Sequence, residues 1–221
     1  MTAYYIMGSE MKSKCIRTFS SNEKLVEERR DQIIRCAIKI FNRKGFDGTS
    51  MRDIAAACGM TSANLYNYIA EKDDIIRLIM KDGNDESYNF IAQADSALKT
   101  MGPAQALVKA IELFYRHIDN RRAGVTFLYR GIASFKNGIR SSVLEVEADE
   151  TSAFQRILDK GCKEKEFIAG DTRLVADNII SLGQMWAVKH GILEKRYSID
   201  TYIKLQTESI LRQVRSGPQR R

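Results

Sequence analysis

Proline is nearly absent from this chain, and its scarcity constrains the fold more than any other feature of the sequence. Only Pro103 and Pro218 occur among 221 residues, so almost nothing interrupts helices between residues 23 and 215. Proline removes a backbone donor and clashes with the preceding helical turn, which is why helix interiors avoid it. No alternation typical of strands persists, and no repeat with a period of about 20–50 residues is present. The sequence therefore predicts an all-α protein.

The composition is that of a folded protein, with 44% hydrophobic and 29% charged residues. These values exclude a mostly disordered chain, and no run of about 18 apolar residues offers a membrane-spanning helix. The first 22 residues lack the pattern of a secretory signal, because their basic residues come too late. We therefore expect a cytoplasmic protein that does not associate with membranes.

The four cysteines are too widely spaced to suggest a metal site. They are Cys15, Cys36, Cys58 and Cys162. No CxxC pair occurs and neither histidine is close in sequence, so neither a metal nor a cofactor is expected, although a cluster formed in space stays open. Reduced thiols in a cytoplasmic protein are the simplest interpretation.

Positive charge gathers at the two ends of the chain. Residues 1–70 hold 11 Lys and Arg against 7 Asp and Glu, whereas residues 71–211 hold 20 against 21. The last ten residues add four arginines and no acid. Because a basic segment attracts polyanions by releasing their counterions, nucleic acid is the first partner to consider, although such a surplus often serves only solubility.

Three helices are predicted between residues 23 and 68. The first begins at Glu23, carries an apolar stripe and ends at Gly45. The stripe consists of Ile33, Ile34, Ala37, Ile38 and Phe41. A second, short helix follows Thr49, with Ser50 and Asp53 as a capping box. Its inward residues are Met51, Ile54, Ala55 and either Ala57 or Cys58.

The third helix runs from Ser62 to about Tyr68, after a turn at Gly59 and a cap at Thr61. Two short helices joined by such a turn are typical of a helix-turn-helix, whose second helix enters the DNA major groove. Longer amphipathic helices are predicted at about 72–99, 103–120, 122–135, 140–167, 171–194 and 199–215. Turn signals at Gly102-Pro103, Asn137-Gly138 and Gly170-Asp171 separate some of them.

Residues 49–76 resemble the DNA-binding segment of the TetR family of bacterial transcriptional repressors. The resemblance covers about fifty residues, 27–77, and combines residue identity with spacing. Its features are Phe41, Gly45, Phe46, Thr49, Ile54-Ala55, Gly59, Leu65-Tyr66, Tyr68 and Lys72 followed by acidic and then apolar residues. Two departures are Ile69, where an aromatic residue is common, and Glu71, where a small hydroxyl residue is common. Glu71 is expected to weaken the cap of the following helix.

The third helix offers a set of candidate DNA contacts. Ser62, Ala63, Asn64, Asn67 and Tyr68 occupy positions that buried Leu65 does not take. Asparagine can bond adenine bidentately, and alanine can meet a thymine methyl group. The resemblance implies phosphate contacts for Thr49, Tyr66, Tyr68 and Lys72, of which Tyr66 equally suits packing against the first helix. The basic residues Lys12, Lys14 and Arg17 either add contacts or belong to a solvated arm.

The residue pattern and charge, together with the resemblance, predict four parts in the chain. Residues 1–22 form a basic arm, 23–71 the helix-turn-helix domain, 72–215 a helical domain for regulation and dimerisation, and 216–221 a basic tail. The last two long helices would build the interface of a homodimer. Their stripes are Leu174, Val175, Asn178, Ile179, Leu182 and Met185-Trp186 on one helix, and Ile203, Leu205, Ile210, Leu211 and Val214 on the other.

A symmetric dimer would place two recognition helices about 34–36 Å apart on a pseudo-palindromic operator in double-stranded DNA. The same stripes equally suit the core of a monomer. The sequence itself does not distinguish a repressor from an activator.

A small hydrophobic effector is expected to release the DNA. Phe127-Leu128-Tyr129-Arg130 is similar to a stretch in TetR-type regulators of fatty-acid and acyl-CoA catabolism, which suggests an acyl-CoA or fatty acid. Candidate contacts are His117, Phe127, Tyr129, Arg130 and Trp186. The aromatic residues equally suit core packing, and Arg130 needs a partner on an apolar helix, such as Glu145, Glu147 or the ligand.

Three other classes of function are alternatives to a sequence-specific regulator. An enzyme is disfavoured because no GxSxG, HExxH, Walker-type loop or GxGxxG is present. A binder without sequence preference would use the positive charge alone. A helical adaptor that has lost its DNA-reading face is disfavoured because Asn64, Asn67, Tyr68 and Lys72 all remain.

Overall fold

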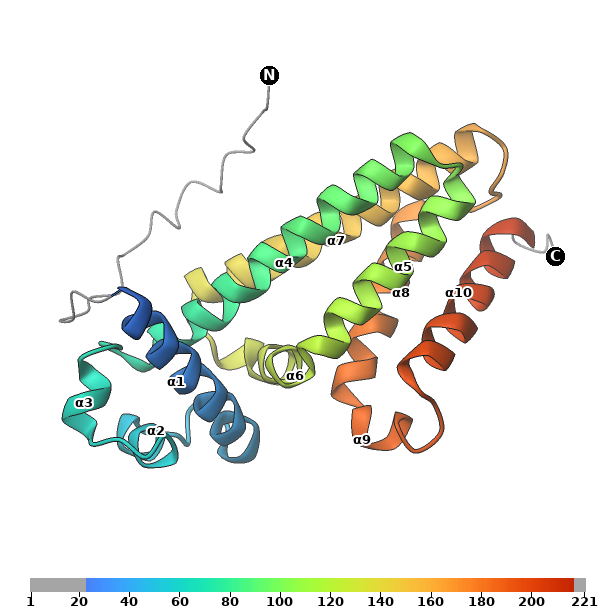
Figure 1. Ribbon diagram of the computed structural model, residues 1–221. Helices are drawn as coiled ribbons and strands as arrows, with labels where there is room; N and C mark the ends of the chain where they lie inside the picture. The colour runs from blue at the N-terminus through green and yellow to red at the C-terminus, as the bar shows by residue number, and fades with distance from the viewer. Residues whose placement is uncertain (1–22, 217–221) are drawn as a thin grey trace, which may run out of the picture. The chain divides into compact units, whose positions relative to one another are not determined.

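The computed structural model describes residues 23–216, and every element in this range is a helix (Figure 1). This confirms the all-α prediction. The elements are α1 (Glu23–Lys44), α2 (Met51–Ala57), α3 (Ser62–Tyr66), α4 (Lys72–Thr100), α5 (Pro103–Asn120), α6 (Arg122–Gly131), the 3-10 helix η1 (Ile132–Ser134), α7 (Asn137–Lys163), α8 (Thr172–Val188), α9 (His190–Leu193) and α10 (Ile199–Ser216). The predicted arm, with Lys12, Lys14, Arg17 and Cys15, and nearly all of the predicted basic tail lie outside the described residues.

The chain forms two compact units, which divide between Leu78 and Ile79. The division falls inside α4, a few residues beyond the predicted boundary at 71/72. The reason lies at the start of α4, where the Lys72 ammonium donates to the carbonyls of Phe46, at 2.6 Å, and Thr49, at 2.9 Å. These bonds join the first turns of α4 to the α1–α2 loop. We call the first unit the DNA-binding unit and the second the helical unit.

Inside the DNA-binding unit, α1 buries Ile33, Ala37, Ile40 and Phe41, while Ile34 is half-buried. The helix ends before Gly45, whose φ of +79° is a left-handed conformation that favours glycine. This is the C-terminal cap that the sequence predicts.

Local caps define α2 and α3. The Ser50 hydroxyl accepts from the Asp53 amide at 3.1 Å, and Asp53 accepts from the Ser50 amide at 2.9 Å, so the predicted capping box is present. Gly59 takes a φ of +67° in the turn, and the Thr61 hydroxyl then caps α3. Cys58, rather than Ala57, is the buried residue at the end of α2.

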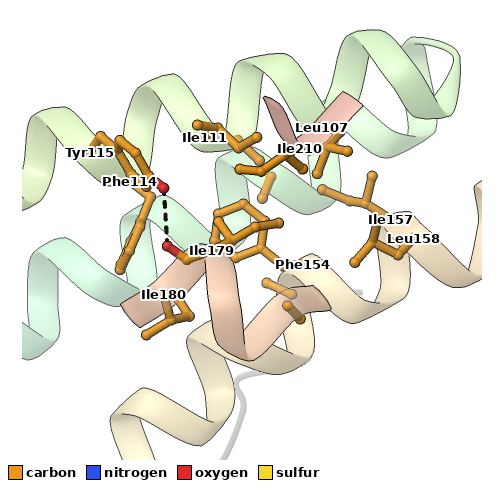
Figure 2. Packing of buried hydrophobic residues seen from close by; sticks show 14 of the residues in the cluster. Leu107, Ile111, Phe114, Tyr115, Phe154, Ile157, Leu158, Ile179, Ile180 and Ile210 are labelled. Atoms are coloured by element: carbon orange, nitrogen blue, oxygen red, sulfur yellow. Dashed lines mark hydrogen bonds between the residues drawn. The ribbon is translucent and has the colours of Figure 1, made fainter. Parts of the chain in front are cut away.

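The helical unit has a core rich in aromatic side chains (Figure 2). Phe90, Phe114 and Phe154 bring their ring centroids within 5.3–5.7 Å of one another, from α4, α5 and α7. The Tyr115 hydroxyl donates to the carbonyl of Ile179 on α8 at 3.2 Å, the dashed line in Figure 2. Within this unit α5 therefore packs against α7 and α8.

Several predicted helix boundaries in this unit are wrong. The predicted helix 122–135 stops at Gly131 and continues as η1, and Asn137-Gly138 opens α7 instead of breaking a helix. The predicted helix 171–194 is interrupted at Lys189, between α8 and α9.

The end of α7 also differs, since the helix stops at Lys163 and not at residue 167. Lys165 adopts a left-handed φ of 62°, and the amides of Glu166 and Phe167 both return to the Gly161 carbonyl. The Phe167 ring then lies over Gly161, in the space that a Cβ atom would occupy. The terminus is therefore set by a tertiary contact.

No helix within residues 23–216 is long and apolar enough to cross a membrane.

Candidate nucleic-acid interface and effector site

Helix α3 presents a polar face to solvent. Asn64, Tyr66 and Asn67 are exposed, Tyr66 by 47%, whereas Leu65 is fully buried. Exposed Ala63 and half-buried Ser62 extend this face at its N-terminal end. The exposure of Tyr66 argues against packing as the main role of that residue, because a ring packed against α1 would be covered.

The expected exposure of Tyr68 is wrong, because its side chain is only 9% exposed. Helix α3 ends at Tyr66, and the amides of Tyr68 and Ile69 both donate to the Leu65 carbonyl. This turn directs Tyr68 inward beside buried Ile69. The Tyr68 carbonyl accepts from the Arg30 guanidinium at 3.3 Å, which ties the end of the recognition segment to α1.

Thr49 and Lys72, two of the predicted phosphate contacts, both hydrogen-bond the backbone around the α1–α2 loop. The Thr49 side chain is buried, and its hydroxyl donates to the Gly45 carbonyl at 2.7 Å. The Lys72 ammonium lies 4.2 Å from the centroid of the Phe46 ring while it donates to the carbonyls of Phe46 and Thr49. An ammonium has three donors, so one further hydrogen bond from Lys72 is compatible with this geometry.

The start of α4 does not need a hydroxyl cap. The Asp74 carboxylate accepts from the Glu71 amide at 3.1 Å, and Arg77 donates to Asp74 at 2.8 Å and to Glu71 at 3.1 Å. The weak helix cap expected from Glu71 is therefore compensated. Asp74 accepts from the backbone amide of Glu71, and Arg77 balances the negative charge of both carboxylates.

An exposed ion pair holds α2 against the end of α1. Lys44 contacts Asp53 at 2.8 Å, and this hydrogen bond, followed by those from Ser50, lowers the pKa of Asp53. The same carboxylate caps α2. Because α2 precedes the turn into α3, the Asp53 carboxylate helps to position the polar face of α3.

In the helical unit, the five predicted effector contacts are not brought together. Phe127 and Trp186 are buried, the first against Phe135 and the second against Tyr202 at 4.9 Å between centroids. Tyr129 and Arg130 are exposed. Arg130 therefore needs no buried partner, which removes the argument that it must meet a ligand or an acid.

Trp186 has a polar partner inside the unit. Its Nε1 donates to the Asp119 carboxylate at 2.7 Å, and Asp119 also pairs with Arg122. The indole N–H is therefore satisfied by a carboxylate of α5.

A chain of polar side chains runs from exposed Glu86 to buried Glu150 in the helical unit, where the sequence predicts only His117. His117 Nδ1 lies 2.9 Å from the Glu86 carboxylate, and its Nε2 lies 3.5 Å from the hydroxyl of buried Ser87. Ser87 in turn hydrogen-bonds Glu150, whose pKa is raised to about 7, mainly by burial. We call Glu86, His117, Ser87 and Glu150 the polar relay.

The sequence contains a signal for the relay. Glu150 belongs to the same helical stripe as Phe154 and Ile157, so an acid stands on an apolar face.

Gly83 lies inside α4, where a glycine would be expected to loosen the helix. Instead, the Arg121 guanidinium occupies the space beside Gly83 where a Cβ atom would stand, and donates to the Ile79 carbonyl at 2.9 Å.

A small apolar cavity of about 200 Å³ lies between the start of α8 and the end of α10. It is lined by Ile168, Ala169, Gly170, Asp171, Leu174, Val175, Gln213 and Val214. None of the predicted effector contacts lines this cavity. Among residues 23–216, no group of three or more His, Cys, Asp or Glu side chains is placed to hold a metal ion.

A three-helix unit with a capped second helix, a left-handed glycine turn and an exposed third helix defines the class of helix-turn-helix proteins. Residues 33–79 match the bacterial regulatory proteins of the tetR family. The chain is 25% identical over 193 residues to the HTH-type transcriptional regulator HbdR of Aromatoleum sp. (strain CIB), across 87% of this chain and 83% of HbdR. The DNA-binding unit therefore carries the match to the tetR family, and the similarity to the regulator HbdR extends over most of the chain.

Solved structures share the fold. A tetR-family regulatory protein from Rhodococcus RHA1 has a TM-score of 0.74 and 20% identity, over 84% of this chain and 96% of that protein. AibR, in complex with isovaleryl coenzyme A and operator DNA, has a TM-score of 0.68 and 20% identity, over 82% of this chain and 97% of AibR. The relatives named here are regulators, so the enzyme alternative is not supported.

Proposed function

We propose that this chain is a repressor that binds a pseudo-palindromic operator as a homodimer and is released by a small hydrophobic effector. The observation that carries the proposal is the exposed polar face of α3. Asn64 and Asn67 would read base edges from this face, while Ser62, Ala63 and Tyr66 would complete the contact with the groove and the backbone. Buried Leu65 anchors the helix from which these side chains project.

Thr49, Tyr68 and Lys72 remain the proposed backbone contacts, with roles adjusted to their burial. Lys72 would donate its third N–H to a phosphate while its other donors hold the α1–α2 loop. Thr49 and Tyr68 have buried side chains, so we propose that they act mainly by positioning the segments around α3.

The homodimer proposal rests on α8 and α10. Most of the predicted stripe residues, including Ile179 and Ile210, are buried inside the unit. Leu174 on α8 and Leu205 on α10 are instead 57% and 46% exposed, and are therefore available to a second copy. A twofold arrangement would set two α3 helices about one DNA turn apart.

For the effector we propose an acyl-CoA or fatty acid. Two observations support this class: the similarity of the segment Phe127–Arg130 to regulators of acyl-CoA catabolism, and the isovaleryl coenzyme A in the AibR complex. An effector releases DNA only by its differential affinity for the two states of the protein. His117, Phe127 and Trp186 would contact it in a state that opens the core, and Tyr129 and Arg130 at its surface.

The test is fluorescence anisotropy on the DNA upstream of the chain's own gene, with excess random DNA as competitor. A sequence-specific regulator should prefer its operator by roughly 10³–10⁷ over random DNA. Asn64→Ala should weaken this binding, whereas Gln105→Ala, an exposed change on α5, should not. Binding that random DNA abolishes would favour the charge-driven alternative.

The same complex is then titrated with acyl-CoAs of increasing chain length. Dissociation at one preferred length is the expected result. A complex that no member of the series dissociates would remove the proposed effector class but leave the operator result intact.

A further inference from the structure

Two cysteine thiols meet inside the DNA-binding unit. Cys36 lies half-buried on α1, and Cys58 is the buried C-terminal cap of α2; both are free thiols. Cys36 is the neighbouring side chain that acts on the Cys58 thiol. An independent bond places the same surfaces together, because Gln32, one turn before Cys36, donates to the Cys58 carbonyl at 3.1 Å.

We propose that Cys36 and Cys58 form a reversible disulfide when the protein meets a low-molecular-weight disulfide, and that this bond weakens operator binding. The formation of the disulfide concerns only the thiols and does not depend on DNA binding. Its effect on operator binding rests on the proposed function. Nothing in the spacing of the two residues, which are far apart along the chain, predicts the pair, since only the packing of α1 on α2 creates it.

The unequal surroundings of the thiols set the order of the reaction. Burial, followed by the neighbouring Cys36, raises the pKa of Cys58 to about 12, so this thiol stays protonated. Cys36 is the more accessible thiol and attacks first. Its thiolate bonds one sulfur of the oxidant and expels the other as a thiolate, which takes up the Cys36 proton.

The second step closes the internal bond. The Cys58 sulfur attacks the Cys36 sulfur of the mixed disulfide, its proton passes to the leaving thiolate, and a second small thiol is released. In total the protein loses two protons and two electrons, and the oxidant takes them up and is reduced to two thiols.

The new bond would pull on the turn that positions α3. A disulfide holds its sulfurs at about 2.0 Å, well inside the contact distance of two unbonded sulfur atoms, so closing the bond draws the now free Cys58 toward α1. The Cys58 amide bonds the Ile54 carbonyl at 3.0 Å, and the next residue is Gly59 in its left-handed conformation. Movement of Cys58 therefore reaches Thr61, the cap of α3, within three residues.

The test uses full-length protein in which Cys15 and Cys162 are replaced by serine, exposed to oxidised glutathione. Peptide mass spectrometry should find a Cys36–Cys58 cross-link that dithiothreitol reverses. A stable glutathione adduct on Cys36, or no reaction, would overturn the proposal. Cys36→Ser in the same background retains buried Cys58 and should give no cross-link.

The DNA consequence is measured on the same samples by anisotropy. The oxidised protein should bind the operator about tenfold more weakly than the reduced protein, comparable to the loss of a base contact. Cys36→Ser should bind equally before and after oxidation. A cross-linked protein with unchanged affinity would overturn the regulatory half, whereas a reduced protein that ignores the operator would overturn the proposed function and leave the cross-link result readable.

Discussion

The two units of this protein are held together in different ways. The DNA-binding unit uses short helices whose ends are defined by nearby residues, such as the capping box of Ser50 and Asp53 and the turn at Gly59. The helical unit uses long helices around an aromatic core in which Phe90, Phe114 and Phe154 come from three different helices.

This difference bears on where function is placed. In the DNA-binding unit the candidate functional side chains, Asn64, Tyr66 and Asn67, are exposed, so they can change without disturbing the interior. In the helical unit the notable polar groups, including Ser87 and Glu150, are buried in the core. Changes there must alter stability as well as any ligand response.

The largest effect is expected from the aromatic core. Phe114→Ala should destabilise the helical unit by about 3–5 kcal/mol, because it removes a fully buried ring and leaves a cavity. Urea unfolding followed by the fluorescence of Trp186, the single tryptophan of the chain, reports this unit. Leu144→Ala, at a position 47% exposed, is the matched control and should change little. Equal effects of both variants would contradict the assignment of the core.

A pH effect of similar size is expected at the polar relay. The folded pKa of Glu150 is about 7, above its ordinary value of 4.5, so its contribution to stability is present below 4.5 and is lost as the pH rises through 7. The loss amounts to at most about 3 kcal/mol. Urea unfolding at both ends of this range should show a decline for the wild type that Glu150→Gln lacks. Exposed Glu145→Gln should retain the decline, and a decline that survives in Glu150→Gln would exclude this origin.

A smaller effect is expected on the exposed face of α3. Asn64→Ala and Asn67→Ala should each cost about 1–3 kcal/mol of operator binding at one base position, without lowering stability. Anisotropy on operators with single base changes locates that position, and urea unfolding serves as the control. A uniform loss on all DNA sequences would assign these residues to the phosphate backbone instead.

The smallest effect tests the local caps. Ser50→Ala should destabilise the DNA-binding unit by about 1 kcal/mol, because the Asp53 amide loses its acceptor. Hydrogen exchange of α2 amides measures this locally. Ser141→Ala, an exposed change on α7, is the control in the other unit, and exchange that spreads equally to α7 would refute the local origin.

The DNA-binding unit follows closely from the sequence because its signals are short-range. The capping box, the glycine turns and the buried positions Ile54 and Leu65 all lie where the spacing predicts them. The error at Tyr68 arises where α3 ends, since the following turn, and not helical periodicity, decides its direction.

The helical unit is less predictable because its details depend on partners distant in sequence. The end of α7 follows from Phe167 lying over Gly161, and the place of Arg121 follows from the space beside Gly83. The predicted effector contacts are aromatic or basic residues that suit a ligand site, but some are buried and others are exposed. Their exposure depends on which helix covers each face, and the sequence does not reveal this.

The helical class, the helix-turn-helix and the residues that cap its short helices follow from residue patterns, because caps, turns and periodicity act over a few residues. The packing of the helices, in contrast, turns Tyr68 inward, joins Glu150 to His117 through Ser87, and brings Cys36 next to Cys58. These contacts join helices far apart in the chain, and their geometry is set by the packing of one helix against another.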